Sequence, residues 1–205
     1  NHFLKPKGLE FAPDPATSSR ATIGGMIANN SSGTKSILYG KTSDHVIELK
    51  VLLADGTIIR TKALTAEALQ AKLNSSDPDR ALYMRMMDIT IPIEEEVKAK
   101  YPKTMRRVGG YAFDDFIASG CGDLNRIIIG SEGTLGIILE ATLKLVDLPK
   151  YKGVSVVQFD HAQDAIKATI TMVKYQPAAV EILSRLLIGY SRKNIETASM
   201  TGFLK

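Results

Sequence analysis

The protein has 205 residues, of which 44% are hydrophobic and 23% are charged, and this composition is typical of a globular domain. Its formal net charge of +4 is too small to indicate nucleic-acid binding. The longest apolar stretch, residues 126–146, is interrupted by charged side chains, and a chain without a run of roughly 18–20 apolar residues is not expected to cross a membrane.

The start of the chain and its cysteine and histidine content narrow the class further. The first residues contain neither a methionine nor the basic and apolar segments of a signal peptide, so we expect a piece of a longer, cytoplasmic protein. The single cysteine, Cys121, has no second thiol for an internal disulfide or a redox pair. His2, His45 and His161 lack the spacing of metal ligands, so no metal site is predicted.

The first 61 residues predict an extended start, a short helix and a hairpin. Three prolines between residues 6 and 15 favour an extended, turn-rich path. Residues 22–36 are rich in Gly, Asn and Ser and predict a tight loop with a short helix. Residues 46–61 alternate with a period of two, with Leu49 and Val51 on one face, and Asp55-Gly56 supplies the turn of a hairpin.

Residues 65–120 predict a helical insert. Thr65 is suited to cap a helix that runs to Leu73, and Asp77-Pro78 is suited to begin a second helix. Three glutamates at 94–96 precede lysines at i+4 spacing, as on an exposed helix. The basic residues between 98 and 107 are interpreted as a solvated face, with an anionic partner as the alternative.

The last 80 residues predict two strands followed by a new domain. Residues 125–129 and 137–146 are predicted strands joined by the sequence GSEGTLG, and in the second strand Leu139 and Ala141 should share one face. After Pro149 the pattern changes. A strand at 154–159, a helix capped by Asp160 with Gln163, and a helix over 180–190 are predicted, so domains of 1–149 and 150–205 are expected.

Two glycine-rich segments, 22–33 and 130–136, carry the chemistry of this sequence. The end of a P-loop is present at 40–42, but Lys35 stands where the motif requires glycine, and no G-x-G-x-x-G turn follows a strand. An NAD-dependent dehydrogenase is therefore not favoured. Glycine lets the backbone approach a flat or anionic ligand, and free N–H groups and hydroxyls can bind it. Either segment alone could be a tight turn, but together they favour a cofactor site.

Three segments of the chain carry a family resemblance. PDPATSSRATIGGMIANNSSG (13–33), YGKTSDHVIELKVLLADG (39–56) and IIIGSEGTLGIILEATLKLV (127–146) resemble the second half of the PCMH-type FAD-binding domain of the vanillyl-alcohol-oxidase superfamily. Within it they are similar to the FAD-linked 2-hydroxyacid dehydrogenases and oxidases, which include glycolate oxidase subunits, D-lactate dehydrogenases and D-2-hydroxyglutarate dehydrogenases. The insert end at 98–116 and PAAVEIL at 177–183 are similar to the large iron–sulfur-fused members.

The resemblance implies an α+β fold, with the second FAD subdomain at 1–149 and the beginning of a substrate or cap domain at 150–205. It implies FAD as cofactor, hydride transfer from a D-2-hydroxy acid to the flavin, and a separate electron acceptor, with any iron–sulfur cluster outside this sequence. The parent protein could be peripheral at the inner membrane. No catalytic residue is assigned. The expected cofactor-binding residues are Pro13, Asp14, Thr22, Ile23, Gly24, Gly25, Asn29, Asn30, Ser32, Gly33, Glu132, Gly133, Gly136, Ile137 and Ile138.

Two features of the family are not found in this sequence, namely the glycine-rich pyrophosphate loop and the histidines of the cap, and Ser184 stands where relatives have aspartate. We therefore expect the isolated chain to bind flavin weakly, to be colourless and to self-associate through exposed apolar surface. The competing hypothesis is a non-catalytic module with a flavin-type fold that binds a protein or an anionic partner through the basic insert.

Overall fold

The computed structural model describes residues 1–204, which divide into one compact unit over 1–148 and a second from Pro149 onward. The first unit contains antiparallel strands and helices, as the α+β prediction requires. None of the helices in residues 1–204 is long and apolar enough to cross a membrane. That the units are an FAD subdomain and the beginning of a cap remains a prediction.

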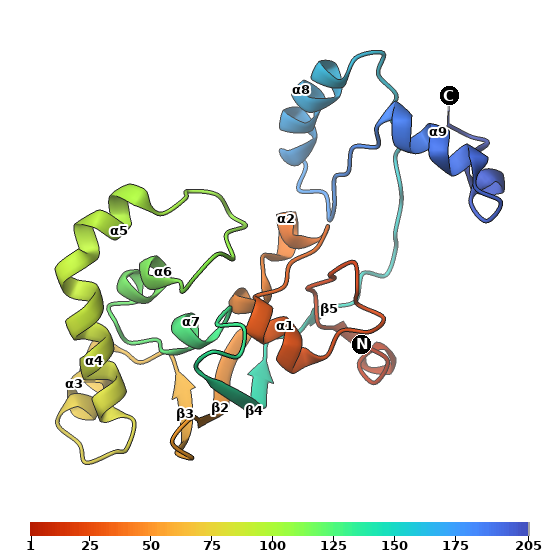
Figure 1. Cartoon of the computed structure of the whole chain (residues 1–205). Coiled ribbons are helices and arrows are strands. Elements are labelled where there is room, and N and C mark those ends of the chain that lie inside the picture. The colour runs from red at the N-terminus through yellow and green to blue at the C-terminus, as the bar shows by residue number, and fades with distance from the viewer. Residues whose placement is uncertain (205) are drawn as a thin grey trace. The chain divides into compact units, whose positions relative to one another are not determined.

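The first unit is built around a sheet of the order β3-β2-β4, formed by β2 (Val46–Leu53), β3 (Ile58–Lys62) and β4 (Gly136–Leu143) (Figure 1). Both pairs are antiparallel, so the predicted hairpin of β2 and β3 is confirmed. Its turn uses Gly56, whose φ of 85° is accessible to glycine, and the Asp55 carboxylate accepts a hydrogen bond of 2.9 Å from the Thr57 amide.

A bulge in β4 changes which side chains face the core. Val51 pairs with Ile138 and Lys50 pairs with Glu140, so Leu139 is the additional residue between them. Beyond this point the alternation changes phase, and Ile138 and Ala141 pack against the core whereas Leu139 is 44% exposed. The prediction that Leu139 shares the face of Ala141 was wrong, because strict alternation cannot anticipate a bulge. The strand also ends at Leu143, before the predicted Val146.

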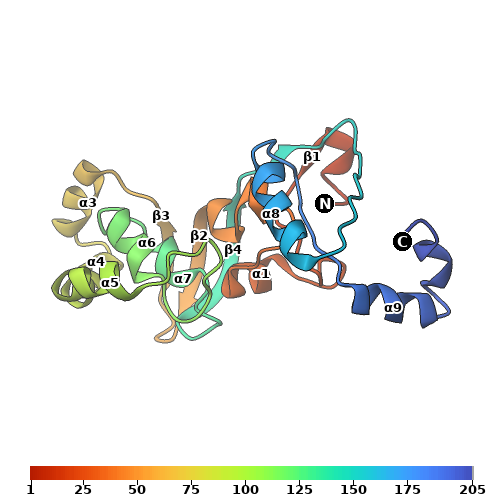
Figure 2. The ribbon, with the colours of Figure 1, turned by 90° about the horizontal axis from the view of Figure 1, so that it is seen from above.

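One face of the sheet carries the first core. Leu49, Val51 and Ile59 pack against two short helices, α1 (Ile23–Asn29) and α7 (Asn125–Ile128). Both helices lie over the strands (Figure 1, Figure 2). The core is completed by Ile27, Ile128 and Ile129. The predicted strand at 125–129 was wrong. The Asp123 carboxylate accepts a hydrogen bond from the Asn125 amide, and the Ile128 amide bonds to the Leu124 carbonyl, so the apolar run turns into a helix.

The opposite face of the sheet carries charged side chains that pair across the strands. Lys50 on β2 lies 2.7 Å from Glu140 on β4, and Arg60 on β3 lies 2.8 Å from Glu48 and 3.1 Å from Glu140. Lysine, arginine and glutamate here alternate between neighbouring strands, which favours the observed register over a slip by one residue. This face is therefore a solvated surface.

The insert predicted over 65–120 is helical, and it lies beyond β3, on the side of the sheet away from β4 (Figure 1, Figure 2). Its helices are α3 (Ala66–Leu73), α4 (Arg80–Thr90), a 3-10 turn (Ile91–Ile93), α5 (Glu94–Lys100) and α6 (Phe113–Ala118). They enclose a second core of Leu69, Tyr83, Phe116, Cys121, Leu124 and Ile127.

Most of the helix starts predicted for the insert were correct or nearly so. Thr65 caps α3 by accepting a hydrogen bond of 3.2 Å from the Ala68 amide, as predicted. α4 begins after Asp79 rather than at Asp77-Pro78. The side chains of Asp77 and Asp79 both bind Lys72, and residues 78 and 79 form a turn before the helix. Burial in the second core raises the pKa of the Cys121 thiol.

The start of the chain lies against the end of the first unit. After a 3-10 turn (Lys5–Lys7), β1 (Leu9–Glu10) pairs with β5 (Val146–Asp147) in a small antiparallel sheet. Two further short elements, α2 (Ser36–Tyr39) and a 3-10 turn (Thr42–Asp44), lead into β2.

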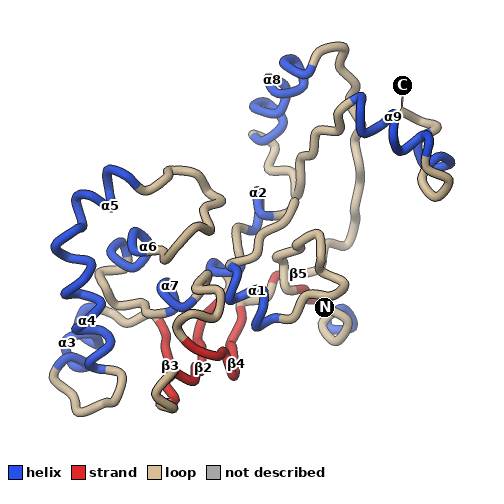
Figure 3. Tube along the Cα trace, viewed as in Figure 1, coloured by secondary structure: helices blue, strands red, loops and turns tan. Residues whose placement is uncertain are grey.

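The second unit contains α8 (Ala162–Val173), α9 (Arg185–Lys193) and a 3-10 turn (Ala198–Thr201), with long connecting stretches drawn tan in Figure 3. Within 149–204 no strand forms at the predicted 154–159, because no neighbouring strand there offers a hydrogen-bonding partner. The residue before α8 is His161 and not the predicted Asp160, and it forms no side-chain cap. α9 begins later than predicted, after Ser184, whose hydroxyl accepts a hydrogen bond from the Leu187 amide.

Candidate functional site

The first half of the site is α1, a short helix that is fixed at both ends. The Thr22 hydroxyl caps its beginning by accepting a hydrogen bond of 3.1 Å from the Gly25 amide. Asn30 ends it in the left-handed conformation, with φ of 49°, and its side-chain oxygen accepts a hydrogen bond of 3.0 Å from the Ser43 amide. The glycines at 24 and 25 therefore lie in a helical turn whose backbone is fixed and thinly covered.

The second half is the 130–136 loop, which connects α7 to β4. Its backbone is left-handed at Gly130, Glu132 and Gly133, with φ of 83°, 52° and 79°. Glycine adopts such angles without strain, whereas at Glu132 the conformation requires support from its surroundings. The sequence GSEGTLG, with glycine at both positions 130 and 133, is suited to this turn.

Direct hydrogen bonds join the two halves. The Gly130 amide donates to the Ile27 carbonyl at 3.0 Å, and the Glu132 amide donates to the Ala28 carbonyl at 2.9 Å. The Asn29 side-chain amide donates to the Glu132 carboxylate at 2.7 Å. These bonds support the left-handed backbone of Glu132 and fix the 130–136 loop to the end of α1.

A cleft of about 280 Å³ lies where α1, the 130–136 loop and the beginning of β4 meet. Its wall consists of small residues, their backbone and two isoleucines, and contains no ionisable side chain. The lining residues are Gly24, Gly25, Ala28, Ser131, Gly133, Gly136, Ile137 and Ile138.

Two glycines in the cleft have opposite surroundings. A Cβ on Gly24 would meet nothing within 4 Å, so the space beside it is open to a ligand. A Cβ on Gly136 would lie 2.6 Å from the Leu52 carbonyl oxygen, so glycine is required there for β4 to pair closely with β2. Ile137, which follows Gly136, is 63% exposed and is one of the residues that line the cleft.

The structure brings together part of the predicted cofactor-binding set. Gly24, Gly25, Gly133, Gly136, Ile137 and Ile138 all line the cleft. Thr22, Asn29, Asn30 and Glu132 hold its two halves in place through the hydrogen bonds described above. Ile23 is 42% exposed at the beginning of α1.

Pro13, Asp14, Ser32 and Gly33 are not among the cleft's lining residues. A Cβ on Gly33 would lie 2.0 Å from the Asp14 carbonyl oxygen, so the two backbones touch. The Asp14 carboxylate accepts hydrogen bonds from the Lys35 amide at 3.1 Å and from the Thr34 hydroxyl at 3.2 Å. Pro13 is buried, and so is Ser32, whose hydroxyl has no hydrogen-bonding partner within residues 1–204.

Two lining residues, Ala28 and Ser131, were missed by the sequence reasoning. Ala28 follows Gly24 by four residues and therefore lies on the same helical face, so helical spacing could have found it. Ser131 is part of GSEGTLG, and its selection would have required knowledge of which residues of the loop turn inward. No cluster of residues suited to hold a metal ion is present in the described part of the chain.

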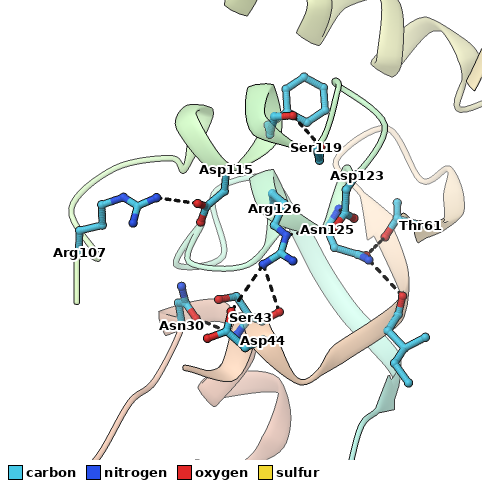
Figure 4. A network of polar contacts seen from close by, with 12 residues as sticks. Asn30, Ser43, Asp44, Thr61, Arg107, Asp115, Ser119, Asp123, Asn125 and Arg126 are labelled. Atoms are coloured by element: carbon cyan, nitrogen blue, oxygen red, sulfur yellow. Dashed lines mark hydrogen bonds and ion pairs between the residues drawn. The ribbon is translucent and has the colours of Figure 1, made fainter. Parts of the chain in front are cut away.

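A polar network around α7 connects this helix to the sheet and to the segment that follows α1 (Figure 4). Arg126 pairs with Asp123 at 3.1 Å and donates to the Ser43 carbonyl at 3.3 Å, next to the amide that binds Asn30. The buried Asn125 accepts a hydrogen bond of 2.6 Å from the Thr61 hydroxyl on β3. α7 is thus tied to the C-terminal end of α1 and to the sheet, so the cleft is supported by a fixed framework.

The composition of the cleft determines which ligands it fits. Its exposed backbone, its small residues and the two isoleucines suit a flat, largely uncharged ring system with polar edges. Ligand pockets commonly measure roughly 300–1,000 Å³, so this cleft fits one ring system of a dinucleotide. The residues present are therefore compatible with the flavin part of FAD, held against Gly24, Gly25 and Gly133.

Comparison with known proteins agrees with this chemistry. Residues 1–62 match a family model described as an FAD binding domain. The chain is 34% identical to the D-2-hydroxyglutarate dehydrogenase of Pantoea ananatis and 35% identical to that of Escherichia coli, in each case over 95% of this chain and 19% of the relative. It is 32% identical to the glycolate oxidase subunit GlcD of Bacillus subtilis, over 89% of this chain and 28% of that protein. The chain thus spans about a fifth of the length of these dehydrogenases.

Proposed function

We propose that the chain forms one wall of the flavin site of an oxidoreductase that acts on a 2-hydroxy acid. Residues 1–62 match a family model described as an FAD binding domain, and the chain is similar over 95% of its length to D-2-hydroxyglutarate dehydrogenases. The observation that carries this proposal is the convergence of two glycine-rich segments, about 100 residues apart in the sequence, on a single cleft.

In this function the residues of the chain bind and orient the cofactor. The bound FAD would accept a hydride from the hydroxyl-bearing carbon of the substrate. Gly24, Gly25 and Gly133 allow the ring to approach the backbone, and Ile137 and Ile138 cover an apolar part of it. The lining contains no ionisable group, so the wall has a binding role and the proton of the substrate hydroxyl is left to groups outside it.

The remaining members of the expected set, including Pro13, Asp14 and Gly33, are proposed to contact the cofactor outside the cleft. The close backbone packing of Asp14 against Gly33 provides a firm edge for such a contact. The substrate class comes from the names of the relatives, which are dehydrogenases of D-2-hydroxyglutarate and a glycolate oxidase subunit. A small 2-hydroxy acid and a separate electron acceptor are accordingly proposed for the whole protein.

The competing hypothesis, a non-catalytic module that binds an anionic partner through the basic insert, is not supported by the geometry. Lys98 pairs with Glu94 at 2.7 Å, and Lys100 pairs with Glu96 at 2.6 Å. Arg107 pairs with Asp115 at 2.7 Å. Neighbouring carboxylates thus neutralise much of the basic run, which leaves little excess charge for an anionic partner.

The proposal can be tested by titrating the ¹⁵N-labelled chain with FAD and following amide chemical shifts, which detect weak binding. The expected shifts are at the cleft residues Gly24, Gly25, Gly133 and Ile137. Gly24→Leu should weaken binding by about tenfold or more, equivalent to about 1.4 kcal/mol, because its side chain takes the open space in the cleft. Thermal stability should not fall, since leucine favours a helix more than glycine does.

The matched control is Gly189→Leu. Gly189 is also a helical glycine whose Cβ would meet nothing within 4 Å, but it lies in α9 of the second unit. This variant should bind FAD as the unmodified chain does. Shifts spread over the whole chain, or equal weakening in both variants, would contradict a flavin site in this cleft.

A further inference from the structure

The helical insert makes a direct contact with the 130–136 loop. The Tyr111 hydroxyl lies 2.8 Å from the Thr134 hydroxyl. Tyr111 belongs to the loop after α5, and Thr134 belongs to the 130–136 loop. Thr134 also donates a hydrogen bond of 2.6 Å to the Ser131 carbonyl. Because a hydroxyl has one proton, Thr134 must accept from Tyr111, and a directed chain results from Tyr111 through Thr134 to Ser131.

This series of hydrogen bonds ends in the wall of the cleft, since Ser131 is one of the lining residues. Hydrogen bonds in such a series polarise and strengthen one another. The hydrogen bond between Thr134 and Ser131 also fixes the two residues between them, Glu132 and Gly133, both of which have left-handed backbone. The insert thus contacts the part of the loop that is most dependent on external support.

Tyr111 is itself well held. Its carbonyl accepts a hydrogen bond of 3.0 Å from the Tyr101 hydroxyl, and its ring stacks on Phe113 with centroids 6.1 Å apart and an interplanar angle of 26°. Phe113 packs against the second core. Burial, together with the charge of Asp114, raises the pKa of the Tyr101 hydroxyl.

The 130–136 loop is consequently held from two sides. α1 binds it through the amides of Gly130 and Glu132, as described above. On the other side Leu135 packs against the second core, next to the contact between Tyr111 and Thr134. The conformation of the loop therefore depends on the insert as well as on α1.

We propose that Tyr111 is a positioning residue that fixes the 131–134 wall of the cleft through Thr134 and thereby sets how tightly the cleft binds its ligand. The identity of that ligand as a flavin rests on the proposed function. The helical insert, whose Tyr111 precedes Thr134 by 23 residues, then acts as a brace on the cofactor site.

The test is Tyr111→Phe, which removes the hydroxyl and keeps the ring and its stacking on Phe113. Amide hydrogen exchange at Ser131, Glu132 and Thr134 should accelerate about 2–10-fold, as expected from the loss of one hydrogen bond. FAD binding, followed by chemical shifts, should weaken by a similar factor. Exchange in the sheet, at Leu49 and Val51, should not change.

Three further variants separate positioning from general destabilisation. Tyr151→Phe removes the hydroxyl of a tyrosine that is 92% exposed, and it should leave exchange and binding unchanged. Thr134→Ser retains the hydroxyl and should behave as the unmodified chain does. Thr134→Val should accelerate exchange. The double variant with Tyr111→Phe should exchange at nearly the same rate as Thr134→Val alone, because the two hydroxyls belong to one series of hydrogen bonds.

Each outcome is decisive. Unchanged exchange at 131–134 in Tyr111→Phe would overturn the proposal, and so would faster exchange with unchanged FAD affinity. If the unmodified chain binds no FAD, the proposed function fails, and the exchange rates still decide whether Tyr111 fixes the wall. A uniform acceleration that includes the sheet would reduce Tyr111 to a stabilising residue and would also overturn the proposal.

Discussion

Gly33 and Asp14 lie closer together than any side chain at position 33 would permit. A Cβ there would be 2.0 Å from the Asp14 carbonyl oxygen and 2.4 Å from its carboxylate. The carboxylate is in turn engaged by Thr34 and Lys35. Glycine at 33 is therefore required by a close approach of two backbone segments, whereas Gly24 is surrounded by open space and is available to a ligand.

At the scale of this residue, Gly33→Ala should destabilise the first unit by about 1–3 kcal/mol, because Asp14 has to move and loses its hydrogen bonds. Thermal unfolding followed by circular dichroism would measure the change, and each kcal/mol corresponds to about 2–4 °C in Tm. Gly109→Ala is the control, since a Cβ there meets nothing within 4 Å. Equal melting of the two variants would contradict the close packing at Gly33.

At the scale of elements, the exposed face of the sheet depends on charges that pair across strands. Hydrogen bonding to Lys50 lowers the pKa of Glu140, and hydrogen bonding to Glu48 raises the pKa of Arg60. A carboxyl whose pKa is lower in the folded state contributes stability above its unfolded pKa of about 4.3. That contribution is lost as the pH falls through the folded pKa.

Glu140→Gln should therefore lower Tm slightly at pH 7 and low salt. The difference from the unmodified chain should disappear near pH 3, where the carboxyl is protonated, and in concentrated salt, which screens exposed charges. Melting curves over a series of pH values would measure it. Glu181→Gln is the control, because Glu181 is exposed and has no ion pair within the described residues. A difference that persists at pH 3 would show that lost packing is responsible.

Some secondary-structure elements were predicted correctly from the sequence, and others were not. The β2–β3 hairpin and the start of α3 were correct because each has a local signal, namely period-two alternation with Asp55-Gly56 and the Thr65 cap. α7 was predicted as a strand, because the apolar run at 127–129 is compatible with either structure. Its helical form is decided by Asp123 and by the bonds of Asn125 to β2 and β3, which lie more than 60 residues away.

At the scale of the whole molecule, the two units differ in how they are packed. The first has two apolar cores, whereas Thr201 is the only buried residue among 149–204. α8 and α9 expose large apolar side chains, including Ile170 at 66% and Leu186 at 67%. The beginning of the second unit has no regular structure at 149–159 and is exposed at Lys150 and Lys152.

Trypsin should consequently cleave first after Lys150 or Lys152 and release a stable product close to residues 1–150. Mass spectrometry would identify the product, and circular dichroism would show that it retains its cooperative unfolding. The first unit contains both halves of the cleft, so the product should also retain the FAD-induced shifts at Gly24 and Gly133. Early cleavage within 101–112 instead would indicate that Tyr111 does not hold that loop in place.

The sequence by itself determined the α+β class, the hairpin, the helical insert and the two glycine-rich segments, because these depend on local periodicity, caps and turn residues. It also indicated a flavin cofactor through its resemblance to a known family. The tertiary structure decided which predicted residues meet in the cleft and how Leu139 is displaced by a bulge. It also decided that Tyr111 of the insert contacts Thr134. These features depend on hydrogen bonds and packing between residues distant in sequence, for which a linear pattern contains no signal.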